Sequence, residues 1–133
     1  MDLKEFLEKN EYRAPTRTEH QRLIQEAIRA RKEIGFPESS RIYQKIILED
    51  GAGSLDLVSF DKEENLSILK AKYIEARKEK TNKRKRMTTK NNLNASLRRA
   101  ENFISSRFNI PQEKIKRIRI IQYGDANFEY SSV

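Results

Sequence analysis

Residues with the side chains that catalysis or metal binding needs are few in this chain, which has no cysteine and a single histidine, His20. Without cysteine there are no disulfides, thiolate metal ligands or thiol nucleophiles. A serine nucleophile would depend on His20 as its base, and the sequence places His20 on the exposed first turn of a helix. Zinc chemistry and acyl transfer are therefore disfavoured. We expect His20 to be an ordinary surface residue, and we expect no resident metal or other cofactor.

Lysine and arginine are concentrated in one segment, residues 77–90. This segment carries eight of them against one acidic residue, Glu79, in a chain of net charge +8. A solvated loop usually mixes both signs of charge, and this segment does not. Dense positive charge binds nucleic acid by releasing counterions from phosphate groups, in contacts that carry no base information. The segment therefore predicts a protein that contacts the phosphate backbone of DNA or RNA.

The predicted nucleic-acid-binding residues extend beyond this segment onto the elements that flank it. No Cys-His finger, heptad array or aromatic RNA-recognition motif accompanies them, so the sequence predicts largely nonspecific binding. The charge also allows a second function, an interaction module for an acidic protein partner. The segment lacks the interleaved apolar residues of a membrane anchor, so no membrane partner is expected. The predicted contact residues are Arg77, Lys78, Lys80, Lys83, Arg84, Lys85, Arg86, Lys90, Arg98, Arg99, Arg117 and Arg119, with Lys70 and Lys72 beside them.

Hydrophobic periodicity predicts the elements that position these residues. Capping boxes that begin at Asp2 and Thr18 predict a short helix within residues 1–14 and a longer helix that Gly35 ends. Alternating apolar residues predict strands, and a spacing of four, three and four predicts a core-facing helix that starts at Thr88, at Thr89 or at one of the two Asn residues that follow. The predicted strands are 41–48, 55–60, 66–75 and 115–123, and the apolar positions of the helix are Leu93, Leu97, Ala100 and Ile104.

The order α-α-β-β-β-α-β predicts a single α+β domain over residues 1–133. A three- to four-stranded, largely antiparallel sheet with the helices packed on one face would bury the apolar stripes. We expect residues 77–90 to be a flexible basic connector, and residues 124–133 to be a tail whose Phe128 and Tyr130 form a short strand or a loose arm. Such an arm could pair with a neighbouring chain's sheet edge in a homo-oligomer.

The sequence also predicts an intracellular location. It shows no secretory signal at its start and no apolar run of bilayer-spanning length. The cytoplasm, including that of a host cell, or the nucleus of a eukaryote would suit a basic protein of this kind.

The order of helix, three strands, helix and strand over residues 18–123 resembles the core of the restriction-endonuclease-like nucleases. Those enzymes place an Asp on one strand and a Glu-x-Lys on the next, so that two carboxylates hold Mg²⁺ while the Lys orients the attacking water. This resemblance implies that Asp56 and Lys72 are the catalytic Asp and Lys. An Mg²⁺-dependent nuclease, active or inactive, is therefore a further alternative to a protein that only binds.

The resemblance departs from the nuclease pattern at Lys70, which stands where the Glu is expected. An ammonium group repels a metal ion, so Glu26 or Glu33 on the preceding helix would have to supply the second carboxylate. A looser similarity, to double-stranded-RNA-binding domains, places the cations of residues 83–90 at the start of the last helix. This chain lacks the Gly-Pro-Ser-Lys-Lys-type motif of those domains and has an additional strand. Both similarities are of element order, which predicts fold better than function.

Overall fold

Five strands form one mixed sheet in the order β1-β2-β3-β4-β5. A computed structural model describes residues 1–12, 18–37, 41–49, 51–75 and 83–133, the side chains of residues 83–85 excepted. Neighbouring strands are antiparallel except for β3 and β4, which are parallel. The α+β prediction and its element order are confirmed, but the sheet has five strands. The segment for which we expected a short strand or a loose arm forms a strand that pairs with β4. The strands are β1 (Ile42–Ile47), β2 (Ser54–Phe60), β3 (Leu66–Ile74), β4 (Ile115–Tyr123) and β5 (Glu129–Ser132).

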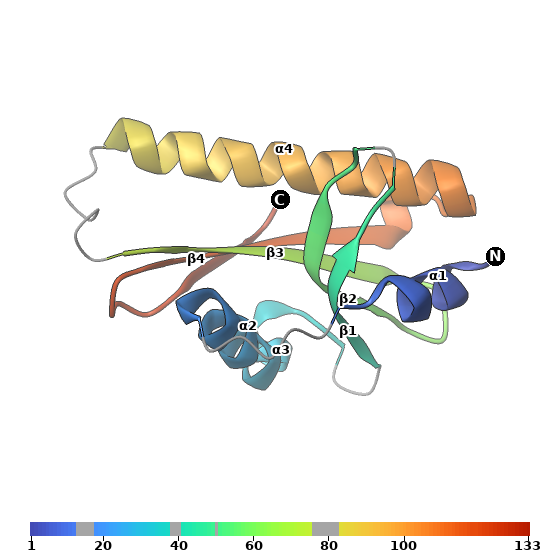
Figure 1. Cartoon of the computed structure of the whole chain (residues 1–133), viewed down its shortest axis with the longest axis horizontal. Coiled ribbons are helices and arrows are strands. Elements are labelled where there is room, and N and C mark those ends of the chain that lie inside the picture. Colours follow the sequence, from blue (N-terminus) through green and yellow to red (C-terminus); the bar gives the residue numbers. More distant parts are fainter. Residues whose placement is uncertain (13–17, 38–40, 50, 76–82) are drawn as a thin grey trace.

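The helices cover both faces of the sheet, not one face as predicted (Figure 1). α4 (Lys83–Phe108) lies on one face with α1 (Leu3–Asn10), and these two share a buried apolar cluster with the sheet. α2 (Glu19–Arg29) and α3 (Arg31–Ile34) bury a second cluster on the opposite face. Both faces need a cover because β3 buries Leu66 and Ile68 toward α4, and Leu69 and Ala71 toward α2.

α4 is the crossover that makes the parallel pairing of β3 and β4 possible. Parallel neighbours cannot be joined by a hairpin, so the chain must return along the sheet before it enters β4. The two strands pair over nine residues each, from Leu66 opposite Ile115 to Ile74 opposite Tyr123. The 26 residues of α4 span about 39 Å at roughly 1.5 Å per residue, which is enough to cover the whole ladder. A short 3₁₀ helix, η2 (Gln112–Lys114), then leads into β4.

The apolar stripe of α4 is confirmed, but the helix begins at least five residues earlier than the sequence predicts. Residues 83–90, which we assigned to a flexible connector, form its first two turns. The Arg86 guanidinium lies 4.5 Å from the centre of the Tyr123 ring, and this cation–π contact holds the start of α4 against the end of β4. Arg77, Lys78 and Lys80 lie outside the described residues. The predicted stripe of Leu93, Leu97, Ala100 and Ile104 is buried.

Both predicted helix caps are present in the structure. Asp2 Oδ1 accepts a hydrogen bond from the Glu5 amide at 2.8 Å, and Thr18 Oγ1 accepts one from the Gln21 amide at 3.1 Å. The helix that Thr18 opens breaks at Ala30 into α2 and α3. Gly35, with φ +92°, ends α3 in the left-handed conformation that favours glycine, as predicted.

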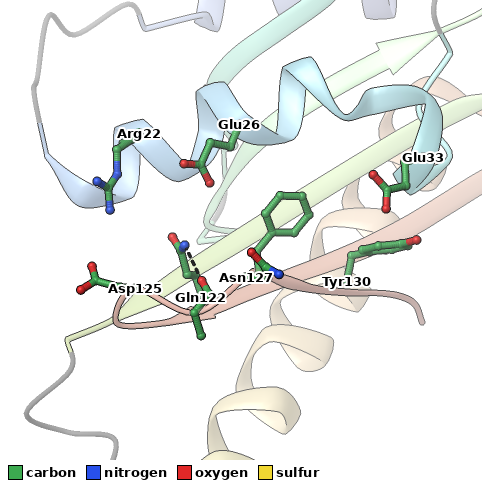
Figure 2. Close-up of a pocket in the computed structure, with 9 residues that line it drawn as sticks. Arg22, Glu26, Glu33, Gln122, Asp125, Asn127 and Tyr130 are labelled. Atoms are coloured by element: carbon green, nitrogen blue, oxygen red, sulfur yellow. Dashed lines mark hydrogen bonds between the residues drawn. The ribbon is translucent and has the colours of Figure 1, made fainter.

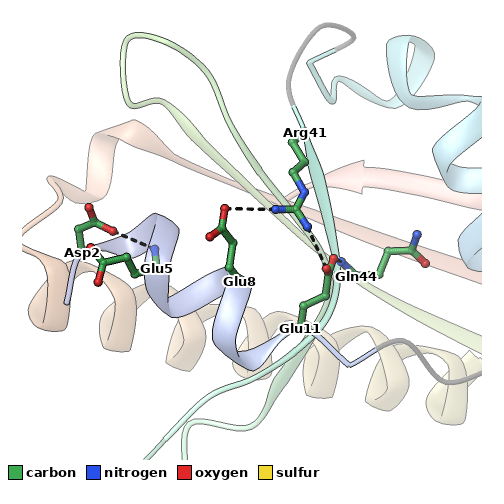
Figure 3. A network of polar contacts seen from close by, with 6 residues as sticks. All are labelled: Asp2, Glu5, Glu8, Glu11, Arg41 and Gln44. Carbon is green, nitrogen blue, oxygen red and sulfur yellow. Dashed lines mark hydrogen bonds and ion pairs between the residues drawn. The ribbon is translucent and has the colours of Figure 1, made fainter.

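An ion-pair network ties α1 to the first strand (Figure 3). The Arg41 guanidinium contacts Glu8 at 3.4 Å and Glu11 at 3.1 Å. The Glu11 carboxylate also accepts a hydrogen bond from the backbone amide of Gln44 at 2.8 Å. These contacts fix α1 at the β1 edge, where Phe6 enters the cluster beneath α4.

Candidate nucleic-acid interface

The β1–β2 ribbon kinks where Lys45 lies opposite Asp56. Lys45 has φ +50°, a left-handed conformation that is rare for a long side chain in a strand. On either side of it, Gln44 pairs with Leu57 and Ile46 pairs with Leu55. Strain of this kind persists only where the surroundings enforce it, and it is concentrated at functional sites. We therefore expect functional side chains beside the kink.

The Asp56 carboxylate has two partners at this kink. Oδ2 accepts a hydrogen bond from the Ala71 amide at 2.8 Å, and Oδ1 lies 3.0 Å from His20 Nε2. The pairing between β2 and β3 ends at Leu57 and Leu69. Beyond this point the Asp56 side chain, in place of a backbone carbonyl, accepts the hydrogen bond of the Ala71 amide. His20 is thus more than the ordinary surface residue we expected, although 43% of its side chain is exposed.

A cavity of about 550 Å³ opens beside Asp56, between the sheet and α4. Four cationic side chains line it, contributed by β1, β3 and α4. Asp56 is the only carboxylate among the described residues that line it, so the walls carry a net positive charge even when His20 is neutral. The lining residues are His20, Lys45, Ser54, Asp56, Lys70, Ala71, Lys72, Thr89, Asn92, Leu93, Ser96 and Arg99.

Lys70 is the most enclosed cation of this cavity. Its Nζ donates to Ser96 Oγ at 2.7 Å across the gap between β3 and α4. Burial lowers the pKa of the Lys70 ammonium below its usual value, and nearby Arg99 lowers it further, while Asp56 opposes both effects. A bound anion would favour the charged form in the same way as Asp56. The site holds a positive charge that is incompletely compensated within the protein.

The two predicted arginines of β4 lie under α4 and have partners within the fold. Arg117 is ion-paired with Glu101 at 2.9 Å and also donates to the Val133 carbonyl at 3.1 Å. Arg119 donates to Asn94 Oδ1 at 2.9 Å. Because both side chains are partly buried and bonded to α4, they hold the helix on the sheet. We do not include them in the proposed contact surface.

The remaining predicted cations lie along α4. Arg99 lines the cavity, and Arg98 is exposed next to it. Lys90 is half-buried and Arg86 is exposed near the beginning of the helix. Lys83, Arg84 and Lys85 form its first turn, which contains no acidic residue.

The charge at the start of α4 is the reverse of what a helix favours. The exposed amides there carry a partial positive charge, which anions stabilise by about 0.3–1 kcal/mol each and cations oppose. Four consecutive cations at this end, Lys83 to Arg86, therefore gain no helix-dipole energy from their position. A phosphate group would be favoured at such a helix terminus.

The structure brings together some of the nuclease candidates and separates others. Asp56, Lys70 and Lys72 line the same cavity, as the nuclease resemblance implies. Glu26 and Glu33 line a different cavity with Gln122, so neither is placed beside Asp56 as the missing second carboxylate. Within the part of the chain that the structure describes, no group of three or more His, Asp or Glu side chains is arranged to hold a metal ion.

Sequence reasoning missed Lys45, Asn92 and Ser96 as members of the cavity. They come from β1 and α4, and only the kink and the crossover bring them beside β3. The one local signal was the pair of lysines at alternate positions of an otherwise apolar strand, Lys70 and Lys72.

Comparisons with protein-family models, with curated proteins and with solved structures found no significant match to this chain. Over the described ranges, none of the helices has both the length and the apolar character that a bilayer crossing requires.

Proposed function

We propose that this protein binds the phosphate backbone of nucleic acid, largely without sequence preference, in the cavity between α4 and the sheet. The observation that carries the proposal is the wall of this cavity, where Lys45, Lys70, Lys72 and Arg99 face a single carboxylate. Four cations from three different elements line one concave surface, unlike the scattered lysines of an ordinary solvated face. Concave positive surfaces concentrate polyanions and speed their association.

The start of α4 extends this surface along the helix. Thr89, Asn92, Ser96 and Arg99 line the cavity from one side of α4, and the cationic first turn continues the same helix beyond them. A backbone that follows α4 would meet positive charge over a long path. Phosphate contacts of this kind position a protein on nucleic acid but do not read its bases.

A double substitution in the cavity, Lys70→Met with Lys72→Gln, tests the proposal. We expect affinity for a short DNA or RNA duplex in 50 mM salt to fall about tenfold, since two phosphate contacts are lost at roughly 1 kcal/mol or less each. The melting temperature should hold or rise, because burial disfavours the charged form of Lys70. Binding is measured by fluorescence anisotropy and melting by calorimetry on the same samples.

The matched control removes two exposed lysines elsewhere, with Lys9→Gln and Lys62→Gln. It lowers the net charge equally, so a general effect of charge would weaken both variants alike. Equal losses in the two variants would contradict a site in the cavity. A synthetic polyglutamate competitor that displaces the duplex at matched charge concentration would favour the acidic-protein partner instead.

Metal-dependent cleavage is the second candidate, because Asp56 and Lys72 line the same cavity. Asp56→Asn is the appropriate variant, since an amide oxygen still accepts from the Ala71 amide, whereas Asp56→Ala would leave that buried donor unpaired. We expect Asp56→Asn to bind nucleic acid slightly more tightly than the wild type, and neither protein to cut plasmid DNA or RNA with Mg²⁺ or Mn²⁺. Cleavage by the wild type that Asp56→Asn abolishes would establish the nuclease and refute a purely binding role.

A further inference from the structure

A second cavity lies on the opposite face of the sheet, between α2–α3 and the turn that joins β4 to β5 (Figure 2). Its volume of about 550 Å³ falls within the range typical of small-molecule sites. Carboxylates and an amide reach into it from the two sides, and two aromatic rings form part of its wall. Its lining includes Glu26, Glu33, Gln122, Asp125, Phe128 and Tyr130.

Gln122 lines this cavity and carries an unpaired acceptor. The residue is only 6% exposed, and its Nε2 donates to the Ala126 carbonyl at 2.8 Å. Because a carbonyl only accepts, this bond fixes which way the amide is turned. Oε1 is then buried with no hydrogen-bond partner among the described residues. Buried acceptors are rarely left unpaired in proteins, so an ordered water or a donor from a bound molecule is the expected partner.

The charge of the cavity selects a cation. Glu26, Glu33 and Asp125 bring three carboxylates, and no described residue forms an ion pair or hydrogen bond with any of them. Arg22, the one cation of the lining, is paired with Glu19. This negative cavity stands out in a chain of net charge +8. It is also large for a bare metal ion, and no metal-holding group occurs among the described side chains.

The aromatic wall favours an organic cation. Phe128 and Tyr130 lie with their ring centres 6.3 Å apart and their planes inclined by 56°. Ring faces attract ammonium and guanidinium groups, and their apolar surface suits the methylene chain of an alkylamine. We propose that this cavity binds a small organic cation with N–H donors, an alkylammonium or a guanidinium. Gln122 Oε1 and the carboxylates accept its hydrogen bonds.

Isothermal titration of nucleic-acid-free protein with spermidine and with agmatine tests this site. We expect saturable binding at one site, and at least about tenfold weaker binding of tetramethylammonium, which is a cation without N–H donors. Glu26→Gln with Asp125→Asn should weaken spermidine binding about tenfold or more. The control Glu113→Gln removes an exposed carboxylate far from the cavity wall and should change nothing.

Gln122→Met isolates the amide acceptor. Spermidine should bind more weakly and lose its advantage over tetramethylammonium, since Met offers no comparable acceptor. Unchanged affinity for spermidine in the Glu26→Gln with Asp125→Asn variant would overturn the proposal. Binding of Mg²⁺ and tetramethylammonium that is as tight as that of spermidine would also overturn it. The carboxylate pair decides the matter even if loss of the Ala126 bond unfolds Gln122→Met, because Glu26 and Asp125 are not buried. Lys70→Met with Lys72→Gln should bind spermidine like the wild type, which separates this site from the phosphate cavity.

Discussion

Raising the salt concentration from 50 to 200 mM should weaken the binding of nucleic acid about a hundred- to a thousandfold. Each phosphate neutralised by a lysine or arginine releases condensed counterions, so the logarithm of affinity falls linearly with the logarithm of salt. With about five contacts, the slope is roughly −4.5 on duplex DNA and −3.5 on single strands. A fourfold change in salt then lowers affinity by about 500-fold and 100-fold, respectively.

The two slopes also distinguish the form of nucleic acid that the cavity accepts. Titrations of one labelled oligonucleotide, alone and annealed to its complement, give both slopes under identical conditions. Substituting Lys70 and Lys72 should make each slope shallower by the amount that one to two phosphate contacts contribute. Lys9→Gln with Lys62→Gln should leave both slopes unchanged. A salt-independent affinity would show that the basic cavity and α4 do not contact phosphate, and would refute the proposed function.

Local sequence signals predicted the elements of this fold well. The caps at Asp2 and Thr18, the stop at Gly35 and the alternation within β3 each act over a few residues, so they can be read without knowledge of the fold. The same reasoning left the last strand open as an alternative to a loose arm, because β5 shows little apolar alternation. Its sequence, Glu-Tyr-Ser-Ser, forms an outer strand that is largely exposed.

The predicted layering, with all helices on one face of the sheet, was wrong for a reason that is visible in β3. Its two faces carry Leu66 and Ile68 on one side, and Leu69 and Ala71 on the other, and each set belongs to a separate buried cluster. A strand that is apolar on both faces requires a cover on both. The one-sided sheet followed from assuming an antiparallel meander with a solvated face, whereas the parallel β3–β4 pair is enclosed.

The candidate site was only partly predictable because it is assembled from distant segments. The basic residues were recognised by their density, but this density says nothing about which cations meet in space. Arg117 and Arg119 are bonded to α4, while Lys45, which lies outside the basic segment, enters the cavity at a kink. Helix propensity explains the early start of α4. Lys and Arg are good helix formers, so the helix continues through them although its dipole opposes their charge.

Replacing Lys83, Arg84 and Lys85 together with Gln tests whether the start of α4 contributes to binding. We expect affinity for duplex at 50 mM salt to fall between about ten- and a hundredfold, since up to three phosphate contacts are lost at roughly 1 kcal/mol or less each. Arg86 is kept because its contact with Tyr123 holds the helix start on the sheet. Gln preserves helix propensity, so the melting temperature should hold or rise once three cations leave the helix N-terminus.

The matched control for this variant removes three exposed cations from other elements, Lys9, Arg29 and Lys62, also by substitution with Gln. A loss of affinity confined to the α4 variant would place phosphate contacts at the helix start. A large fall in melting temperature would instead assign the three residues a role in the fold. If the α4 variant binds normally while Lys70→Met with Lys72→Gln does not, binding is confined to the cavity. The density of charge along the sequence would then have identified the right ligand but the wrong contact residues, because the geometry of β3 and α4 selects which cations reach the phosphates.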